Sequence, residues 1–320
     1  MQPTVAIAYG SADDSRIERD LLRAIDANLV HIGGLDTPEA RATIGAADAL
    51  MVTTHLVPAD LIAAMQRCRV ISRAGTGLDA IDIPAATARG IWVAYVPDYS
   101  VDEVSSHAIA LLLAHARGIP RLIEAARAGS WSNQSVVPLR RLRGQTLGIF
   151  GFGRIGQMVA AKATGLGMHV QAHDRFLAPE QVAAAGAYPV DWETLLRTSD
   201  YLSLHAPLTN DTQMVINAQT LALMKPTAVL INTARGGLID EPALDQALQD
   251  GRLAAAALDV LTVEPPSPDH ALLKNPRAMI TPHSAWYSED ANIDVRVRAA
   301  EEVVRVLRGE RPRCPANELT

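Results

Sequence analysis

Short apolar runs alternate with longer stretches of helical period along almost the whole chain. This alternation is typical of units in which each strand is followed by a helix and the strands form a parallel sheet. The expected strands before residue 100 are Thr4–Tyr9, Leu29–Ile32, Ala49–Thr53, Val70–Ser72 and Trp92–Tyr95. The pattern restarts at Thr146, with Thr146–Phe150, Met168–His173, Tyr201–His205, Val229–Asn232, Ala255–Val260 and Met279–Thr281. The sequence therefore predicts an α/β fold of two doubly wound domains.

Helical stretches fall between these runs. The clearest are Ser15–Asn28, Pro58–Arg67, Val101–Arg117, Ile155–Thr164, Ala243–Gln249 and Asp290–Arg308. Asp240 is the predicted N-cap of the helix that contains Ala243, and Gly251 ends it. Gly118-Ile-Pro120 is expected to break the long helix that begins at Val101. The segment Ala125–Arg143, with a glycine, a proline and four arginines, is expected to lie outside the core.

Composition excludes several classes of function. The 320 residues suit two domains better than one, and 48% of them are hydrophobic. A net charge of −6 gives no general electrostatic reason to bind nucleic acid or an anionic membrane. Only Cys68 and Cys314 are present, too few for a disulfide framework or a CxxC metal site. The start resembles no secretion signal and Ala108–Ala114 is too short to span a bilayer, so we expect a cytoplasmic protein.

A glycine-rich motif, Gly151-Phe-Gly-Arg-Ile-Gly156, lies between the predicted strand Thr146–Phe150 and the helix Ile155–Thr164. Its three glycines are Gly151, Gly153 and Gly156. These glycines could serve only a tight turn, but between a strand and a helix they predict a dinucleotide site. The first glycine permits the tight turn, the second lets the backbone approach the pyrophosphate, and the third allows the helix to pack closely on the strand. Asp174, at the end of the next strand, predicts NAD because a carboxylate binds the ribose hydroxyls and repels a 2′-phosphate. Arg175 beside it could hold such a phosphate.

Arg235, Glu264 and His283 each follow a predicted strand. If these strands are neighbours, the three side chains meet at the carboxyl edge of the sheet, where open α/β sheets bind ligands. Arginine pairs with carboxylate or carbonyl oxygens, histidine exchanges protons near neutral pH, and a carboxylate favours the imidazolium. Each residue alone could be an ordinary loop residue. Together, beside a dinucleotide fold, they predict the reduction of a 2-oxo acid.

The chain resembles the D-2-hydroxyacid dehydrogenases. The matching segments are Arg73–Asp79, Leu142–Gly153, Asn232–Gly237, Ala257–Val260 and Thr281–His283, in the order found in the family. Within the family, Arg73 and Pro282–Glu289 are most similar to the C-terminal binding protein branch, which contains co-repressors as well as dehydrogenase-like proteins. The resemblance gives His205 no role in proton transfer, and His107 is expected to be structural.

The resemblance implies a division of labour between two domains with an active-site cleft between them. Residues 1–99 and 288–320 would form the substrate-binding domain, and residues 100–287 the NAD-binding domain. Backbone N–H groups around Ala74 and Gly75 would bind the substrate carboxylate, and Arg73 and Trp286 would select the substrate side chain. Besides the three glycines, the implied cofactor contacts are Thr76, Arg154, Ile155, Asp174, Ala206, Pro207, Thr212, Thr233, Ala234 and Asp259.

The expected function is hydride transfer between NAD(H) and a D-2-hydroxy acid/2-oxo acid pair, with His283 as the acid and base. A homodimer is expected, built through the helix from Val101 and the segment 120–143. One alternative is an NAD(H)-sensing binding protein of the co-repressor type. Another is a phosphoglycerate-type dehydrogenase. We disfavour this second alternative because we expect no regulatory domain after residue 310. Glyoxylate, hydroxypyruvate, phenylpyruvate-like and branched 2-oxo acids all stay open as substrates.

Overall fold

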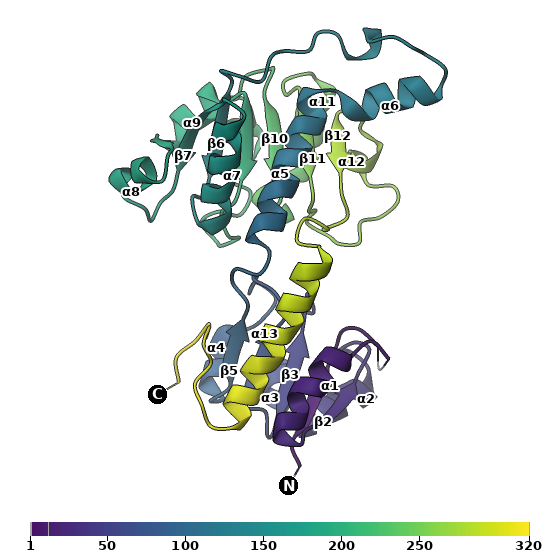
Figure 1. The fold of residues 1–320 in the computed structure, drawn as a ribbon, viewed down its shortest axis with the longest axis vertical. Coiled ribbons are helices and arrows are strands. Elements are labelled where there is room, and N and C mark those ends of the chain that lie inside the picture. The colour runs from purple at the N-terminus through teal and green to yellow at the C-terminus, as the bar shows by residue number, and fades with distance from the viewer. Residues whose placement is uncertain (1, 12, 320) are drawn as a thin grey trace. The chain divides into compact units, whose positions relative to one another are not determined.

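The chain forms two compact units. The computed structural model describes residues 2–11 and 13–319. One unit consists of Met1–Tyr99 and Ser288–Thr320, and the other of Ser100–Tyr287. Each is a parallel β-sheet with helices on its faces (Figure 1). The predicted fold class of two doubly wound α/β domains is confirmed, whereas the roles of the two units stay predictions at this point.

The first unit contains a five-stranded sheet in the order β2-β1-β3-β4-β5, with every pairing parallel. Its strands are β1 (Thr4–Ile7), β2 (Asn28–His31), β3 (Ala49–Val52), β4 (Val70–Arg73) and β5 (Trp92–Tyr95). All four residues of β3 are buried, as expected of a central strand covered on both faces. The sequence predicts all five strands, with small differences at their ends.

Helices from both ends of the chain cover this sheet. They are α1 (Arg16–Leu22), the 3₁₀ turn η1 (Arg23–Ile25), α2 (Pro38–Ala46), α3 (Ala59–Ala64), α4 (Ile83–Ala88) and α13 (Glu289–Leu307). In α13, Val295, Ala299 and Val303 belong to the same buried cluster as Val5 and Val70 of the sheet. Burial of this apolar stripe is what joins the C-terminal helix to the N-terminal residues.

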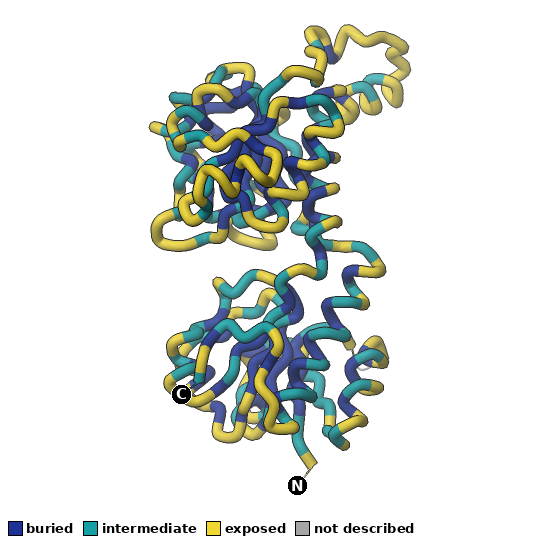
Figure 2. The backbone as a smooth tube through the Cα atoms, turned by 60° about the vertical axis from the view of Figure 1, so that its left-hand side comes forward, coloured by how far each residue is buried: buried dark blue, intermediate teal, exposed yellow. Residues whose placement is uncertain are grey.

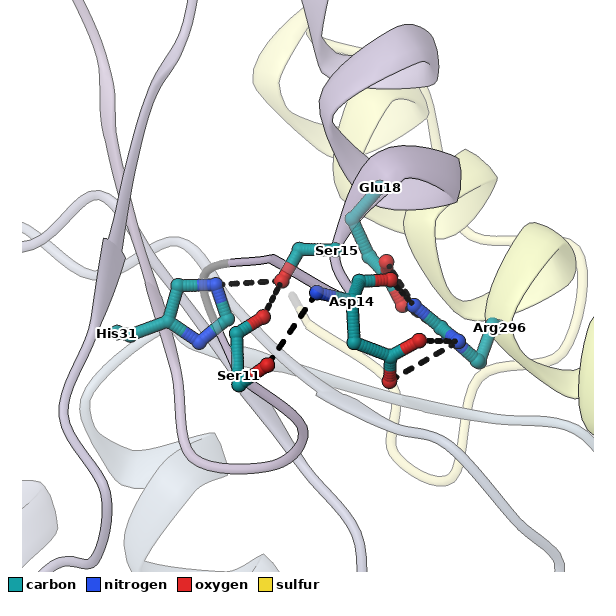
Figure 3. Close-up of polar contacts among 6 residues, drawn as sticks. All are labelled: Ser11, Asp14, Ser15, Glu18, His31 and Arg296. Atoms are coloured by element: carbon teal, nitrogen blue, oxygen red, sulfur yellow. Dashed lines mark hydrogen bonds and ion pairs between the residues drawn. The ribbon is translucent and has the colours of Figure 1, made fainter.

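A buried ion pair also joins α13 to α1 (Figure 3). Nε and Nη2 of Arg296 each donate to the Glu18 carboxylate at 2.8 Å, and Nη2 also donates to the Asp14 carbonyl at 2.6 Å. Glu18 is fully buried, at 0% exposure. Beside it, the Ser15 hydroxyl lies 2.5 Å from His31 Nε2. The paired charges therefore sit in a closed polar network at the start of α1.

The second unit contains a seven-stranded parallel sheet in the order β12-β11-β10-β9-β6-β7-β8. Its strands are β6 (Thr146–Phe150), β7 (His169–His173), β8 (Tyr188–Pro189), β9 (Tyr201–Leu204), β10 (Val229–Asn232), β11 (Ala255–Leu258) and β12 (Ala278–Ile280). The strand order reverses at β6, between β7 and β9, so the loop after β6 opens at a topological switch point. Figure 2 shows the buried backbone gathered at the centre of each unit.

Ten helical segments belong to the second unit in the described residues. They are α5 (Val101–Ala116), α6 (Ile119–Arg127), η2 (Gln134–Val136), α7 (Arg154–Gly165), α8 (Pro179–Ala184), α9 (Trp192–Thr198), α10 (Ala218–Leu221), η3 (Gly236–Leu238), α11 (Glu241–Gln249) and α12 (Ala271–Lys274). The predicted cap of α11 is confirmed, since Asp240 accepts a hydrogen bond from Ala243 N at 3.1 Å. The helices α5 and α7 pack side by side on one face of the sheet.

The predicted break after Val101–Arg117 is confirmed, since α5 ends at Ala116. The sequence does not predict that a second helix, α6, begins at once. Gly118 takes a left-handed conformation (φ 60°) as the N-cap of α6, and Pro120 lies in the first turn, where its missing N–H costs nothing. No residue of α6 is buried, so the expectation of an excursion outside the core holds from Ile119 onward, with Val136 as a buried exception.

In the described part of the chain, no helix combines the length and the apolar character needed to cross a membrane.

Candidate active site

The three candidate catalytic residues follow three adjacent strands. Strands β10, β11 and β12 pair in register as parallel neighbours, which confirms the prediction made from their apolar runs. Arg235 comes after β10, Glu264 after β11 and His283 after β12. The carboxyl ends of parallel strands point to one edge of the sheet. A guanidinium, a carboxylate and an imidazole therefore gather there.

His283 and Glu264 form a direct pair. His283 Nδ1 lies 2.5 Å from Glu264 Oε2, and the two side chains keep 34% and 33% of their exposure. The other carboxylate oxygen, Oε1, accepts a hydrogen bond from Leu261 N at 2.9 Å, which fixes the orientation of the carboxylate. Because Nδ1 is engaged with Glu264, Nε2 is the ring nitrogen left to exchange a proton with a substrate.

The charge state of Glu264 is set by its neighbours. Partial burial by itself raises the pKa of the Glu264 carboxyl. The hydrogen bonds from His283 and Leu261 and the positive charges of His283 and Arg235 outweigh burial, so that the pKa lies below its ordinary value. Glu264 is therefore ionised near neutral pH, and an ionised carboxylate favours the protonated form of the ring it contacts. The contribution of Arg235 also indicates that its guanidinium lies near the pair.

The turn that carries His283 (residues 281–285) is held by Asp259. His283 itself has a positive φ of 50°, which is costly for a residue with a side chain. Its N–H donates to the Asp259 carbonyl at 2.8 Å. The buried Asp259 carboxylate accepts hydrogen bonds from Ser284 N at 3.0 Å, Ala285 N at 2.9 Å and the Thr281 hydroxyl at 2.5 Å. The implied contact between Asp259 and nicotinamide stays a prediction, while this network positions His283.

The turn that carries Arg235 is held by a buried asparagine. Asn232 Nδ2 donates to the Arg235 carbonyl at 2.8 Å, and Asn232 Oδ1 accepts from Ala234 N at 3.0 Å. Arg235 Nη1 donates to the Ala234 carbonyl at 2.7 Å. The next residue, Gly236, leaves no room for a side chain, because a Cβ there would lie 2.0 Å from the carbonyl carbon of Leu261. The Arg235 turn and the turn that ends in Glu264 are therefore in backbone contact.

The glycine loop has the geometry predicted for a dinucleotide site. Gly151 (φ 88°) packs so closely that a Cβ would lie 2.4 Å from Ala206 N. A Cβ at Gly156 would lie 2.4 Å from the Gly151 carbonyl oxygen, which explains the close packing of α7 on β6. Gly153, the N-cap of α7, differs: a Cβ there would meet no heavy atom within 4 Å in the described part of the chain. This open backbone at a helix N-terminus fits a pyrophosphate.

Further predicted cofactor residues lie around this loop. Asp174 Oδ2 accepts from Phe152 N at 2.7 Å, which ties the end of β7 to the glycine loop that contains Arg154 and Ile155. The Thr233 hydroxyl is buried and has no hydrogen-bond partner among residues 2–11 and 13–319, so it can take one from a cofactor. Thr212 closes its own loop by donating to the Pro207 carbonyl at 2.7 Å. The residues present fit NAD, although each individual contact stays a prediction.

The predicted substrate residues of the first unit gather at the end of β4. Arg73 Nη1 donates to the Ala74 carbonyl at 2.8 Å, and a Cβ on Gly75 would collide with this guanidinium. Binding of the substrate carboxylate by N–H groups around Ala74 and Gly75 stays a prediction, and two of these groups have partners inside the protein. Ala74 N donates to the Val52 carbonyl at 2.8 Å, and Gly75 N to the Arg73 carbonyl at 2.9 Å. The second of these bonds, from an N–H to the carbonyl two residues earlier, is of the γ-turn type.

Two other predicted residues have contacts within their own units. Thr76 donates its hydroxyl to the Val96 carbonyl at 3.0 Å in the first unit. In the second unit, the half-buried Trp286 makes an edge contact with Tyr287 at a ring separation of 5.5 Å. The roles of Thr76 in cofactor binding and of Trp286 in substrate selection stay predictions.

The expectation that His205 and His107 take no part in proton transfer stays a prediction. His205 is buried, and burial lowers its pKa to about 4, so the ring is neutral near neutral pH. His107 of α5 lies behind the His283 turn, with Nε2 3.0 Å from the Thr281 hydroxyl oxygen. Within residues 2–11 and 13–319, no group of three or more His, Cys, Asp or Glu side chains could hold a metal ion.

Sequence reasoning missed two residues that support the Glu264 turn. Glu241 accepts a hydrogen bond from Thr262 N, and His270 contacts Glu241. Both positions lie in helix-start segments, where an acidic residue or a histidine is common for local reasons. Only the three-dimensional structure reveals that these two segments meet next to the turn that ends in Glu264.

Comparison with known proteins identifies the family. Residues 109–285, more than half of the chain, match the family model described as "D-isomer specific 2-hydroxyacid dehydrogenase, NAD binding domain". The chain belongs to the D-isomer-specific 2-hydroxyacid dehydrogenase family. The second unit is thus an NAD-binding domain, and NAD is the cofactor predicted from the glycine loop. The narrower resemblance to the C-terminal binding protein branch stays a prediction.

The relatives of this chain are named for several activities. The chain is 39% identical over 277 residues to a D-3-phosphoglycerate dehydrogenase of Archaeoglobus fulgidus. That alignment covers 86% of this chain and 52% of the relative. The chain spans about half the length of the curated relatives it matches. A D-lactate dehydrogenase of Aquifex aeolicus, solved with NAD and lactic acid, has a TM-score of 0.88 at 27% identity, covering 96% of each chain. A glyoxylate reductase of Paecilomyes thermophila has a TM-score of 0.88 at 29% identity, covering 98% of each.

Proposed function

We propose that this protein is an NADH-dependent 2-oxo acid reductase that produces a D-2-hydroxy acid. The observation that carries the proposal is the contact of 2.5 Å between His283 Nδ1 and Glu264 Oε2 at a sheet edge shared with Arg235. An acid that is kept protonated and a cation for the substrate oxygens are what the reduction needs besides the cofactor. The family and the fitting glycine loop support the choice of cofactor.

Each residue of the set has a distinct task. When bound, NADH supplies the hydride that reduces the keto carbon. Arg235 offers a planar fork to the carboxylate or carbonyl oxygens and favours charge on the carbonyl oxygen. His283 donates the proton on Nε2 to that oxygen, and in the reverse direction takes it back. Glu264 orients the ring and stabilises its positive charge. We further propose that Arg73, Ala74, Gly75 and Trp286 recognise the substrate, as the resemblance implies.

A phosphorylated substrate is the second candidate. The relatives in Archaeoglobus fulgidus and Methanocaldococcus jannaschii are D-3-phosphoglycerate dehydrogenases, at 39% and 40% identity. These names favour a phosphoglycerate-type substrate over lactate, whose named dehydrogenase is 27% identical. The shared site performs the same redox step in either case. Only the group that binds the substrate side chain differs.

A substrate panel tests the proposal. Purified protein is mixed with NADH and, separately, glyoxylate, pyruvate, hydroxypyruvate, phenylpyruvate, a branched 2-oxo acid and 3-phosphohydroxypyruvate, and NADH absorbance is followed. Turnover of an unphosphorylated 2-oxo acid with the highest kcat/KM supports the main proposal, and preference for the phosphorylated one supports the second. NADH binding without turnover of any member would refute both and favour a binding protein that senses NAD(H).

Cofactor preference depends on an ion pair beside Asp174. The Arg175 guanidinium pairs with Asp211, and both side chains are 68% exposed. This pairing occupies the cation that could otherwise hold a 2′-phosphate. Replacing Asp211 with asparagine should raise kcat/KM for NADPH by about two- to fivefold, the size expected of an exposed ion pair, and leave NADH within about twofold. The two cofactors are compared in steady-state assays. An unchanged NADPH value would show that Asp211 does not restrain Arg175.

We propose a homodimer that buries the exposed apolar residues of α6 and the segment after it. Ile119 is 44% exposed, Ile123 45%, Trp131 96% and Val137 60%. Replacing Trp131 with glutamate should weaken the dimer by about 30-fold, since a buried aromatic anchor is lost and a charge enters the contact. Light scattering over a dilution series measures the effect. Tyr188→Glu, at an exposed aromatic of β8, is the matched control; equal effects, or a monomeric wild type, would refute this interface.

A further inference from the structure

The turn of residues 261–264, which we call the Glu264 turn, determines where the catalytic carboxylate lies. It follows β11 and folds back on itself, since Glu264 Oε1 accepts from Leu261 N at 2.9 Å. Thr262, Val263 and Glu264 are exposed, so little packing holds this part of the chain. Contacts that hold the backbone of the turn therefore help to keep the carboxylate in place.

Glu241 provides such a hold. It is the first residue of α11, and its Oε1 accepts a hydrogen bond from Thr262 N at 2.6 Å. Its other oxygen, Oε2, lies 3.1 Å from His270 Nε2. The Glu241 side chain is 13% exposed, less than the 33% of Glu264. A carboxylate is a strong acceptor for the N–H of Thr262.

His270 fixes the orientation of Glu241. Its ring contacts Glu241 through Nε2, and its buried Nδ1 has no hydrogen-bond partner in the described part of the chain. Glu241 and His270 thus form a second carboxylate–imidazole pair next to the Glu264 turn, in addition to the pair of Glu264 and His283.

The contact between Glu241 and Thr262 N also affects the turn that carries Arg235, the third catalytic residue. Gly236, directly after Arg235, packs against the same peptide: a Cβ there would lie 2.0 Å from the Leu261 carbonyl carbon and 2.3 Å from Thr262 N. A shift of the Thr262 peptide would therefore move the wall of the Arg235 turn as well as Glu264. We propose that Glu241 and His270 are positioning residues that fix the Glu264 turn for catalysis. This inference rests on the proposed reductase activity.

Paired substitutions test the proposal. Glu241→Ala should lower kcat by about 10- to 100-fold through misplacement of Glu264 and of the Arg235 turn, with the Kd for NADH within about twofold. Glu241→Gln, whose amide oxygen can still accept from Thr262 N, should recover most of the loss. His270→Leu should lower kcat in the same way, and His270→Gln, which keeps a donor, should restore it. Glu193→Ala removes an exposed first-turn acid of α9, paired with Arg197 at 2.8 Å, and should leave kcat unchanged.

Hydrogen exchange at the Thr262 amide, read by NMR, is a measurement independent of activity. Thr262 is exposed, so its amide is protected by the bond to Glu241, and exchange should be faster in Glu241→Ala but not in Glu193→Ala. Wild-type kcat in both Glu241→Ala and His270→Leu, or unchanged exchange, would overturn the proposal. If Glu241→Ala does not fold, His270→Leu against His270→Gln decides. If the wild type turns over no 2-oxo acid, the proposed function fails. The exchange rates alone then decide whether Glu241 holds the Glu264 turn.

Discussion

Replacing His283 with asparagine should lower kcat for 2-oxo acid reduction by about 10²- to 10⁴-fold, the usual contribution of a positioned general acid. Asparagine is polar and can still contact Glu264, which lies 2.5 Å from Nδ1 in the wild type. Its amide has no acidic proton, so the developing charge on the carbonyl oxygen is not neutralised by proton transfer. Steady-state NADH consumption gives kcat, and fluorescence titration should show NADH binding within about twofold of wild type.

The matched control for this change is His169→Asn. His169 is an exposed histidine at the start of β7, so it lies at the opposite edge of the sheet from the strand ends that carry the site. Its substitution should leave kcat within about twofold. A His283→Asn protein with kcat within about threefold of wild type would remove His283 from proton transfer and leave Glu264 without a catalytic partner.

Replacing Arg296 with methionine should destabilise the first unit by about 3–5 kcal/mol, because it leaves the Glu18 carboxylate buried without its cation. Glu18 is 0% exposed and accepts two hydrogen bonds of 2.8 Å from the guanidinium. Methionine keeps the apolar part of the side chain, so lost packing is a small part of the effect. Urea unfolding followed by circular dichroism measures it.

Two further variants separate this charge effect from a general effect of altering α13. Arg298→Met removes a surface arginine paired with Asp98 at 2.5 Å, where the side chains are 31% and 46% exposed, and should cost less than about 1 kcal/mol. Adding Glu18→Leu to Arg296→Met removes the unpaired charge and should recover most of the loss. Equal losses for Arg296→Met and Arg298→Met would contradict a role for the buried pair.

The sequence predicts every strand except β8, and it predicts the meeting of Arg235, Glu264 and His283, because these follow from local patterns. Buried parallel strands are continuous apolar runs, and the residues after them come to one sheet edge whatever the strand order. The predicted pairing of the imidazole with the carboxylate is found between Nδ1 and Oε2. The glycine loop is predicted for a similar reason, since its backbone conformation requires glycine at three nearby positions of the sequence.

What the sequence does not predict depends on contacts between distant segments. Glu241 and His270 meet only because α11 and the start of α12 lie under the Glu264 turn. The start of α6 is missed because Gly118 and Pro120, read as helix breakers, can also be a cap and a first-turn residue. The engagement of Ala74 N with Val52 is missed because it requires the register of β3 beside β4.

The pH dependence of reduction, compared between the wild type and Glu264→Gln, is the most direct test that the His283–Glu264 pair handles the proton. Reduction requires a protonated ring, so kcat falls as the pH rises. The pKa of Glu264 lies below its ordinary value, so the wild-type carboxylate is charged throughout this range. Glutamine removes the charge that favours the imidazolium, so we expect the falling limb to move to lower pH. Superimposable limbs in the two proteins would contradict proton donation by this pair.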